Sequence, residues 1–231
     1  MRYSLVLLRL LAISLFLTAL TVQAEYIAKK STRLLSNNFE GSLERHELVD
    51  VTEKWQRRIS YGEWLVQRDG SIKAVNVPEH GHGPVLTFLG PIKNVTIQCE
   101  FQLPTQEGPD RHFRIFLDHP DYRGHTIQAW ANLSTTFRPE GITLQHIRKD
   151  KDGKTVEDIE FGQRDFPLKP GAWYEMRLEL FGDLVQVTVD GVSIQGRHTA
   201  LDVEKFKIGL NFGKAGGAIR NFRVWQAVPK R

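Results

Sequence analysis

The segment Asn94-Val-Thr-Ile-Gln-Cys-Glu-Phe-Gln-Leu103 decides the fold class. Its odd-numbered residues are apolar and its even-numbered residues are polar. Because successive side chains of a β-strand point to opposite faces, this period of two predicts a strand with one buried and one polar face. Cys99 lies on the apolar side and is the only cysteine of the chain. We therefore expect a buried thiol without an intrachain disulfide.

Comparable alternating segments recur on both sides of this strand, separated by turn residues such as Asp69-Gly70 and Asp190-Gly191. The segments are Trp64–Val66, Ile72–Val75, Phe113–Leu117, Gly124–Trp130, Gly141–Ile147, Trp173–Leu180, Val185–Val189, Lys205–Phe212 and Ala218–Trp225. Short strands at this regular spacing are typical of antiparallel sandwiches. The sequence predicts an all-β fold, a two-sheet antiparallel β-sandwich of about eleven or twelve strands without a long helix.

Residues 1–24 have the pattern of a secretory signal peptide. An apolar stretch follows Arg2 from Leu5 to Leu20, and Val22-Gln23-Ala24 supplies small residues for cleavage. We expect the protein to be exported, to the periplasm or the extracellular space, and not to be held in a membrane after cleavage. The alternative is a retained anchor, because the stretch approaches the roughly 20 residues that span a bilayer.

The rest of the chain is expected to hold one domain, since sandwiches of this length often do not divide. Residues 25–54 are expected to form a partly irregular N-terminal extension, and residues 55–228 the β-sandwich. The formal net charge is +4, with 31 basic and 27 acidic residues. Basic residues are interleaved with acidic ones and form no run of five or more, so nucleic acid is not an expected partner.

Two acids are the catalytic candidates. Cleavage of a glycosidic bond usually needs two carboxyl groups on one face. Glu100 and Asp118 each alternate with the apolar residues of an expected central strand, so each should point outward. The alternative for both is an exposed or salt-bridged acid without a catalytic role.

Five other residues predict a saccharide-binding surface. Arg114, Gln128, Trp130 and Gln145 fall on outward positions of neighbouring expected strands, with His125 at the entrance to one of them. Guanidinium and amide groups hydrogen-bond to sugar hydroxyls, and an indole ring can stack on a sugar face. For Trp130, ordinary packing is the alternative.

Histidines are unevenly distributed, with six of the eight between residues 80 and 146. These are His80, His82, His112, His119, His125 and His146. Imidazoles near a carboxylate can bind a metal or transfer protons. No pair has the close spacing of a preformed ligand set, so we expect no metal and no other cofactor.

The C-terminal half carries a set of framework motifs: Lys169-Pro-Gly-Ala-Trp-Tyr174, Gly182, Val189-Asp-Gly191, Ile208-Gly-Leu210 and Ile219-Arg-Asn-Phe-Arg-Val224. Together they resemble the 3-keto-disaccharide hydrolase domain family, over roughly Trp64 to Trp225. The resemblance implies a concanavalin A-like jelly roll in an exported protein. It also implies hydrolase or lyase activity on a glycoside held by the concave sheet face.

Three polar positions differ from the family's pattern. Asp118 stands at a position where members of the family have an arginine. Thr126 replaces a glutamate two residues before the retained Gln128. The segment Asn211-Phe-Gly-Lys214 replaces a Gln-Asp-His-Gly segment of the family. Two functions therefore stay open. One is a carbohydrate-active domain that acts on a saccharide, as a glycoside hydrolase or lyase, or binds it on the concave sheet face. The other is a non-catalytic, lectin-like or protein-interaction module of the cell envelope.

Overall fold

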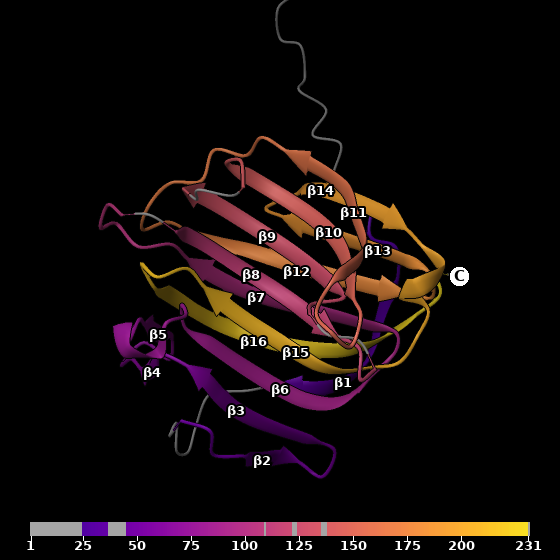
Figure 1. Cartoon of the computed structure of the whole chain (residues 1–231), viewed down its shortest axis with the longest axis horizontal. Coiled ribbons are helices and arrows are strands. Elements are labelled where there is room, and N and C mark those ends of the chain that lie inside the picture. The colour runs from indigo at the N-terminus through magenta and orange to yellow at the C-terminus, as the bar shows by residue number, and fades with distance from the viewer. Residues whose placement is uncertain (1–24, 37–44, 109, 122–123, 135–137, 231) are drawn as a thin grey trace, which may run out of the picture.

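The chain forms two antiparallel β-sheets that pack face to face (Figure 1). The computed structural model describes residues 25–36, 45–108, 110–121, 124–134 and 138–230. The expected signal peptide, residues 1–24, lies outside these ranges. None of the helices in the described ranges has the length and hydrophobicity that crossing a bilayer requires.

Each sheet has eight strands. Sheet A runs in the order β14-β13-β12-β7-β16-β5-β4, with β1 paired to β16. Its strands are β1 (Lys29–Ser36), β4 (Glu63–Val66), β5 (Ile72–Val75), β7 (Val95–Gln102), β12 (Trp173–Phe181), β13 (Leu184–Val189), β14 (Val192–Arg197) and β16 (Gly217–Val228).

Sheet B runs in the order β11-β10-β9-β8-β15-β6-β3-β2. Its strands are β2 (Val49–Thr52), β3 (Trp55–Tyr61), β6 (Val85–Ile92), β8 (Arg111–Asp118), β9 (Ile127–Ser134), β10 (Gly141–Lys149), β11 (Thr155–Arg164) and β15 (Lys205–Phe212). Two single-turn 3₁₀ helices complete the described elements, η1 (Pro78–His80) and η2 (Thr199–Leu201).

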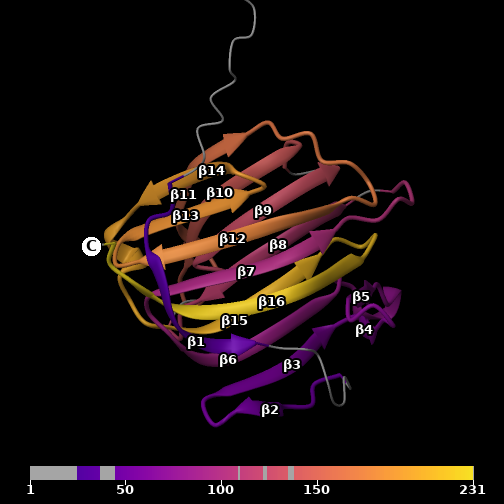
Figure 2. The ribbon, with the colours of Figure 1, turned by 180° about the vertical axis from the view of Figure 1, so that it is seen from behind.

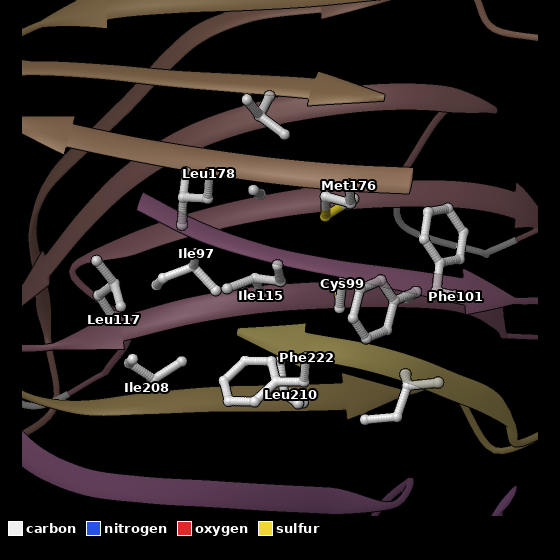
Figure 3. Packing of buried hydrophobic residues seen from close by; sticks show 14 of the residues in the cluster. Ile97, Cys99, Phe101, Ile115, Leu117, Met176, Leu178, Ile208, Leu210 and Phe222 are labelled. Carbon is white, nitrogen blue, oxygen red and sulfur yellow. The ribbon is translucent and has the colours of Figure 1, made fainter. Parts of the chain in front are cut away.

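β7, the strand on which the fold prediction rests, lies in the interior of sheet A between β12 and β16. All of its odd-numbered residues are buried, as predicted. Figure 3 shows Cys99 and Phe101 among apolar side chains of both sheets. The ring of Phe101 stacks on that of Phe113 in sheet B at 4.9 Å. Cys99 is a free buried thiol whose pKa is raised by desolvation, as expected for a core residue.

Two predicted Asp-Gly turns close hairpins of sheet A. Asp190 and Gly191 have φ values of 43° and 87° between β13 and β14. Positive φ at both positions is the requirement of a type I′ turn, whose twist matches that of the strands. Asp69-Gly70 lies between β4 and β5, where the Asp69 carboxylate accepts a 3.0 Å hydrogen bond from the Ser71 amide. Both hairpins are confirmed.

The segment before Trp55 contributes to both sheets. β1 pairs with β16 in sheet A, and β2 pairs with β3 in sheet B. Figure 2 shows β1, in indigo, beside β16. Tyr26 lies under the Arg177 guanidinium at 3.5 Å, and the Lys30 ammonium lies 3.9 Å from the Trp225 ring. The expected extension thus supplies two strands and covers part of the outer face of sheet A.

The described residues form sixteen strands, more than expected. Two of the additional strands give only a weak sequence signal: β2 has only four residues, and β11 has no buried position. The strand expected from Gly124 begins instead at Ile127, since Gly124 has a φ of 83° that suits a turn. The charged run from Arg148 to Glu160 lies in the β10–β11 hairpin.

Candidate ligand-binding face

Polar side chains gather on the outer face of sheet B. The register places Arg114 of β8 opposite Trp130 of β9 and Asn211 of β15. Gln128 of β9 lies opposite Gln145 of β10. We call these five residues the polar face. Four of the five residues expected to bind a saccharide therefore meet on one surface, as their parities predict.

Arg114 is the centre of the polar face. Its Nη1 donates a 2.7 Å hydrogen bond to Gln128 Oε1, and its Nη2 donates a 2.8 Å bond to Asn211 Oδ1. The guanidinium carbon lies 4.4 Å from the Trp130 ring. Burial lowers the pKa of Arg114 to about 9, and the negative charge of Asp118 only partly opposes this shift. The group therefore keeps its positive charge near neutral pH.

A second guanidinium, that of Arg138, contacts the other end of the polar face. It donates a hydrogen bond to Gln145 Oε1, lies 3.5 Å from the Glu160 carboxylate and 5.6 Å from the Trp130 ring. Gln145 in turn donates to the Asp158 carboxylate. Trp130 is only 5% exposed beneath these groups. Its ring is packed, and it presents no open platform for stacking.

A pocket of about 320 Å³ opens beside the polar face, on the same side of sheet B. Phe116 joins the two, because its ring lies 3.8 Å from the His125 ring and 5.1 Å from the Arg114 guanidinium. We call this space the sheet B pocket. It is lined by His46, Arg58, Ser60, Tyr61, His82, Val85, Thr87, Phe116, His125 and Lys207.

Asp118 holds two residues of the pocket wall in place. Its Oδ2 lies 2.5 Å from the Lys207 ammonium, and its Oδ1 accepts a 2.8 Å hydrogen bond from His125 Nδ1. Desolvation lowers the pKa of His125, although the hydrogen bond to Asp118 opposes that shift. Asp118 is itself 5% exposed. Both its oxygens are thus occupied by wall residues.

The two expected catalytic acids do not form a pair. Glu100 lies on β7 of sheet A, whereas Asp118 lies on β8 of sheet B. Glu100 accepts a 2.7 Å hydrogen bond from Arg220 Nε and a second bond from Asn221. The expectation of two acids on one face is therefore corrected. The alternation within each strand predicts that each acid lies on the outer side of its own sheet. It does not predict to which of the two sheets the strand belongs.

One cluster in the described residues has metal-ligand types close together: His146, Glu157 and His198, whose ligand atoms lie within 4.8 Å of one another. His146 Nε2 lies 2.7 Å and His198 Nε2 3.6 Å from the Glu157 carboxylate. Arg148 Nε approaches the same carboxylate at 3.8 Å. Because the carboxylate already faces these three nitrogen groups, we assign no cation here. The absence of a metal stays a prediction.

A larger groove of about 890 Å³ lies at one end of sheet A. We call it the sheet A groove. Its walls include Arg68, Asp69, Lys73 and Trp173. The Trp173 ring packs against the Arg220 guanidinium at 4.2 Å. Two cations and one acid give this groove charges of both signs, in contrast to the sheet B pocket.

Comparison with known proteins supports the architecture. No protein-family model and no curated protein sequence matches the chain. A carbohydrate-binding module, CBM66 from Bacillus subtilis, superposes with a TM-score of 0.51 at 11% identity, covering 74% of this chain and 95% of that one. The CBM2 module of the evolved Dit protein of Lactobacillus casei BL23 phage J-1 has a TM-score of 0.56 at 10% identity, covering 89% and 100%. At these identities the similarity shows the fold alone. By its architecture, the chain is a two-sheet jelly-roll sandwich similar to these modules.

Proposed function

We propose that the protein binds a saccharide in the sheet B pocket. The observation that carries this proposal is the pocket's mixture of rings and hydrogen-bonding groups. Tyr61 offers a partly exposed ring, and Arg58, Ser60 and His125 offer polar atoms, whereas the buried Phe116 ring forms the floor between them. A sugar presents an apolar face together with many hydroxyl groups, so it needs both kinds of contact. The similarity in fold to carbohydrate-binding modules supports the same assignment.

The polar face has a supporting role in this proposal. Arg114, Gln128, Trp130 and Gln145 are between 2% and 8% exposed, and they contact one another or Arg138. A polar group that already has a protein partner gains little from a ligand. We infer that these residues position Phe116 and the adjoining wall, whereas His125 contacts the ligand directly.

We propose binding rather than the hydrolysis of a 3-keto-disaccharide that the sequence resemblance implies. Glycoside cleavage usually uses two carboxyl groups beside the scissile bond. The residues described as lining the pocket include no carboxylate, and Asp118 directs both oxygens at Lys207 and His125. The lectin-like alternative therefore agrees better with the geometry than the hydrolase does.

We also propose that the protein acts outside the cytoplasm, because residues 1–24 resemble a cleavable signal peptide. Mass spectrometry of the protein recovered from its native host tests this. A new N-terminus at Glu25 supports export, and recovery of the intact chain starting at Met1 contradicts it.

A glycan array followed by calorimetric titration of the purified protein tests saccharide binding. Replacing Tyr61 with Ala removes a ring from the sheet B pocket, and Trp173→Ala removes one from the sheet A groove as the matched control. We expect Tyr61→Ala to weaken binding by about ten-fold or more, since stacking contacts contribute on the order of 1 kcal/mol beyond area. Equal weakening by Trp173→Ala would move the site to sheet A. No saccharide bound by the wild type would reject the proposal.

A further inference from the structure

The charges around the sheet B pocket are unevenly distributed. Two basic side chains, Arg58 and Lys207, line it together with three imidazoles. The described lining includes no acid. Behind Phe116, the Arg114 guanidinium adds a third positive charge 5.1 Å from that ring. A pocket whose walls carry one sign of charge raises the local concentration of ligands of the opposite sign.

Asp118, the acid that contacts the pocket wall, does not cancel this excess. Asp118 lies against Lys207 and His125, with both of its oxygens occupied by these two wall residues. It therefore compensates the charge of Lys207 and leaves those of Arg58 and Arg114. The hydrogen bonds of Arg114 go to the neutral amides of Gln128 and Asn211, which engage two of its donors without neutralising it.

Arg58 is the group best placed to contact an anion. It projects from β3 into the pocket and is partly buried. Its Nε is shielded from solvent and has no hydrogen-bond acceptor among the described residues. A guanidinium has five donors in a rigid fork that matches a carboxylate or a sulfate. Leaving such a donor buried and unpaired costs free energy, which a bound anion would recover.

The sheet A groove shows that this arrangement is not general to the surface. There Asp69 accompanies Arg68 and Lys73, so both signs of charge are present. Arg68 is also exposed rather than partly buried. The unbalanced positive charge is thus a property of the sheet B pocket.

We propose that the sheet B pocket selects saccharides that carry an acidic group, a carboxylate or a sulfate ester, with Arg58 as the principal contact to that group. This inference rests on the proposed saccharide-binding function. It adds the class of saccharide and the residue that distinguishes it. Neutral sugars retain the ring and hydroxyl contacts but lose the charge-assisted hydrogen bonds to Arg58.

Calorimetric titration with matched pairs of ligands tests the inference. A galacturonic acid trisaccharide is compared with its methyl ester, which has the same shape without the charge, and galactose 6-sulfate is compared with galactose. Inorganic sulfate is titrated alone. We expect at least one acidic member to bind about ten-fold or more tightly than its neutral partner, as charge-assisted hydrogen bonds imply. The pair that shows the difference identifies the carboxylate or the sulfate as the source.

Two variants separate the role of Arg58 from general effects. Arg58→Gln should reduce the preference for the acidic ligand to about three-fold or less, because the affinity for the acidic ligand falls more than the affinity for its neutral partner. Arg68→Gln removes one positive charge from the sheet A groove and should leave the preference intact. Thermal unfolding of both variants confirms that they fold.

The outcomes separate the two proposals. If acidic and neutral partners bind equally, or if Arg58→Gln keeps the preference, the inference fails and saccharide binding stands. If neither acidic nor neutral sugars bind, the proposed function fails. If inorganic sulfate binds and none of the sugars does, both the proposed function and the inference fail, because the pocket is then an anion site only.

Discussion

Asp118 and Lys207 face each other on the neighbouring strands β8 and β15, with Oδ2 and Nζ 2.5 Å apart. The other oxygen of the same carboxylate accepts a hydrogen bond from His125. One buried acid therefore sets the positions of two side chains that line the sheet B pocket. The geometry gives Asp118 a positioning role for which a catalytic function is not needed.

Replacing Asp118 with Asn tests this role. The change removes the negative charge that faces Lys207 and His125, so we expect the free energy of unfolding to fall by about 2 kcal/mol, the range of hydrogen bonds to charged groups. Glu100→Gln is the matched control, because Glu100 is more exposed and its pairing is worth under about 1 kcal/mol. Denaturant unfolding measures both. Equal losses would argue against a special role for Asp118.

Gly209 makes room for the Phe116 ring. A Cβ at position 209 would lie 1.8 Å from the nearest ring atom, so Gly209→Ala must displace Phe116. We expect saccharide affinity to drop by about ten-fold and stability by about 1–3 kcal/mol, as in overpacked sites. Gly108→Ala is the control, since no atom lies within 4 Å of its Cβ. Unchanged affinity in Gly209→Ala would show that Phe116 is not part of the binding site.

Arg114→Lys tests whether the buried network needs a guanidinium. A lysine keeps the charge but cannot bond to Gln128 and Asn211 in the same fork or stack on Trp130. We expect the free energy of unfolding to fall by about 2–4 kcal/mol, because two charged hydrogen bonds and one ring contact are lost. The exposed Arg223 offers the same substitution on sheet A as a control. If both variants unfold at the wild-type denaturant concentration, the network does not stabilise the sheet.

Acid should destabilise the protein through His112. Burial, and next the charge of Arg114, lower its pKa from 6.5 to about 4. The unfolded chain therefore takes up a proton as the pH falls below 6.5, whereas the native state resists until about pH 4. The stability associated with neutral His112 is fully present above pH 6.5 and is lost over this window, by about 3 kcal/mol.

The measurement is the free energy of unfolding between pH 7 and pH 4 for the wild type and for His112→Gln. We expect a shallower dependence in the variant. The free energy of unfolding of the variant should still depend on pH, because the pKa values of His119 and His125 are also lowered, mainly by desolvation. Identical slopes in the two proteins would contradict the assignment of His112 as a buried neutral imidazole.

Alternation along the chain was sufficient to predict most of the strands and the convergence of Arg114, Gln128, Trp130 and Gln145. Each residue lies on the outer side of its strand, and hydrogen bonding between β8, β9 and β10 brings them together. Lys207 was within reach of the same reasoning, because it alternates with buried Ile208 and Leu210 in a strand that the sequence predicts.

Other features depend on long-range pairing that a local period does not contain. Glu100 and Asp118 both have outward parity, yet they belong to different sheets. Trp130 has outward parity too, but Arg114 and Arg138 cover it, the latter from a segment without a strand pattern. Arg58 enters the pocket from β3, where the inward neighbour Arg57 is also basic and obscures the alternation.

The most direct test of the central claim is a nuclear magnetic resonance titration of the isotope-labelled protein with the saccharide that binds best. We predict amide shift changes at three residues of β3, two of β6 and three others that line the sheet B pocket: Arg58, Ser60, Tyr61, Val85, Thr87, Phe116, His125 and Lys207. Changes centred instead on Lys73, Gln102 and Trp173, in the sheet A groove, would contradict the account.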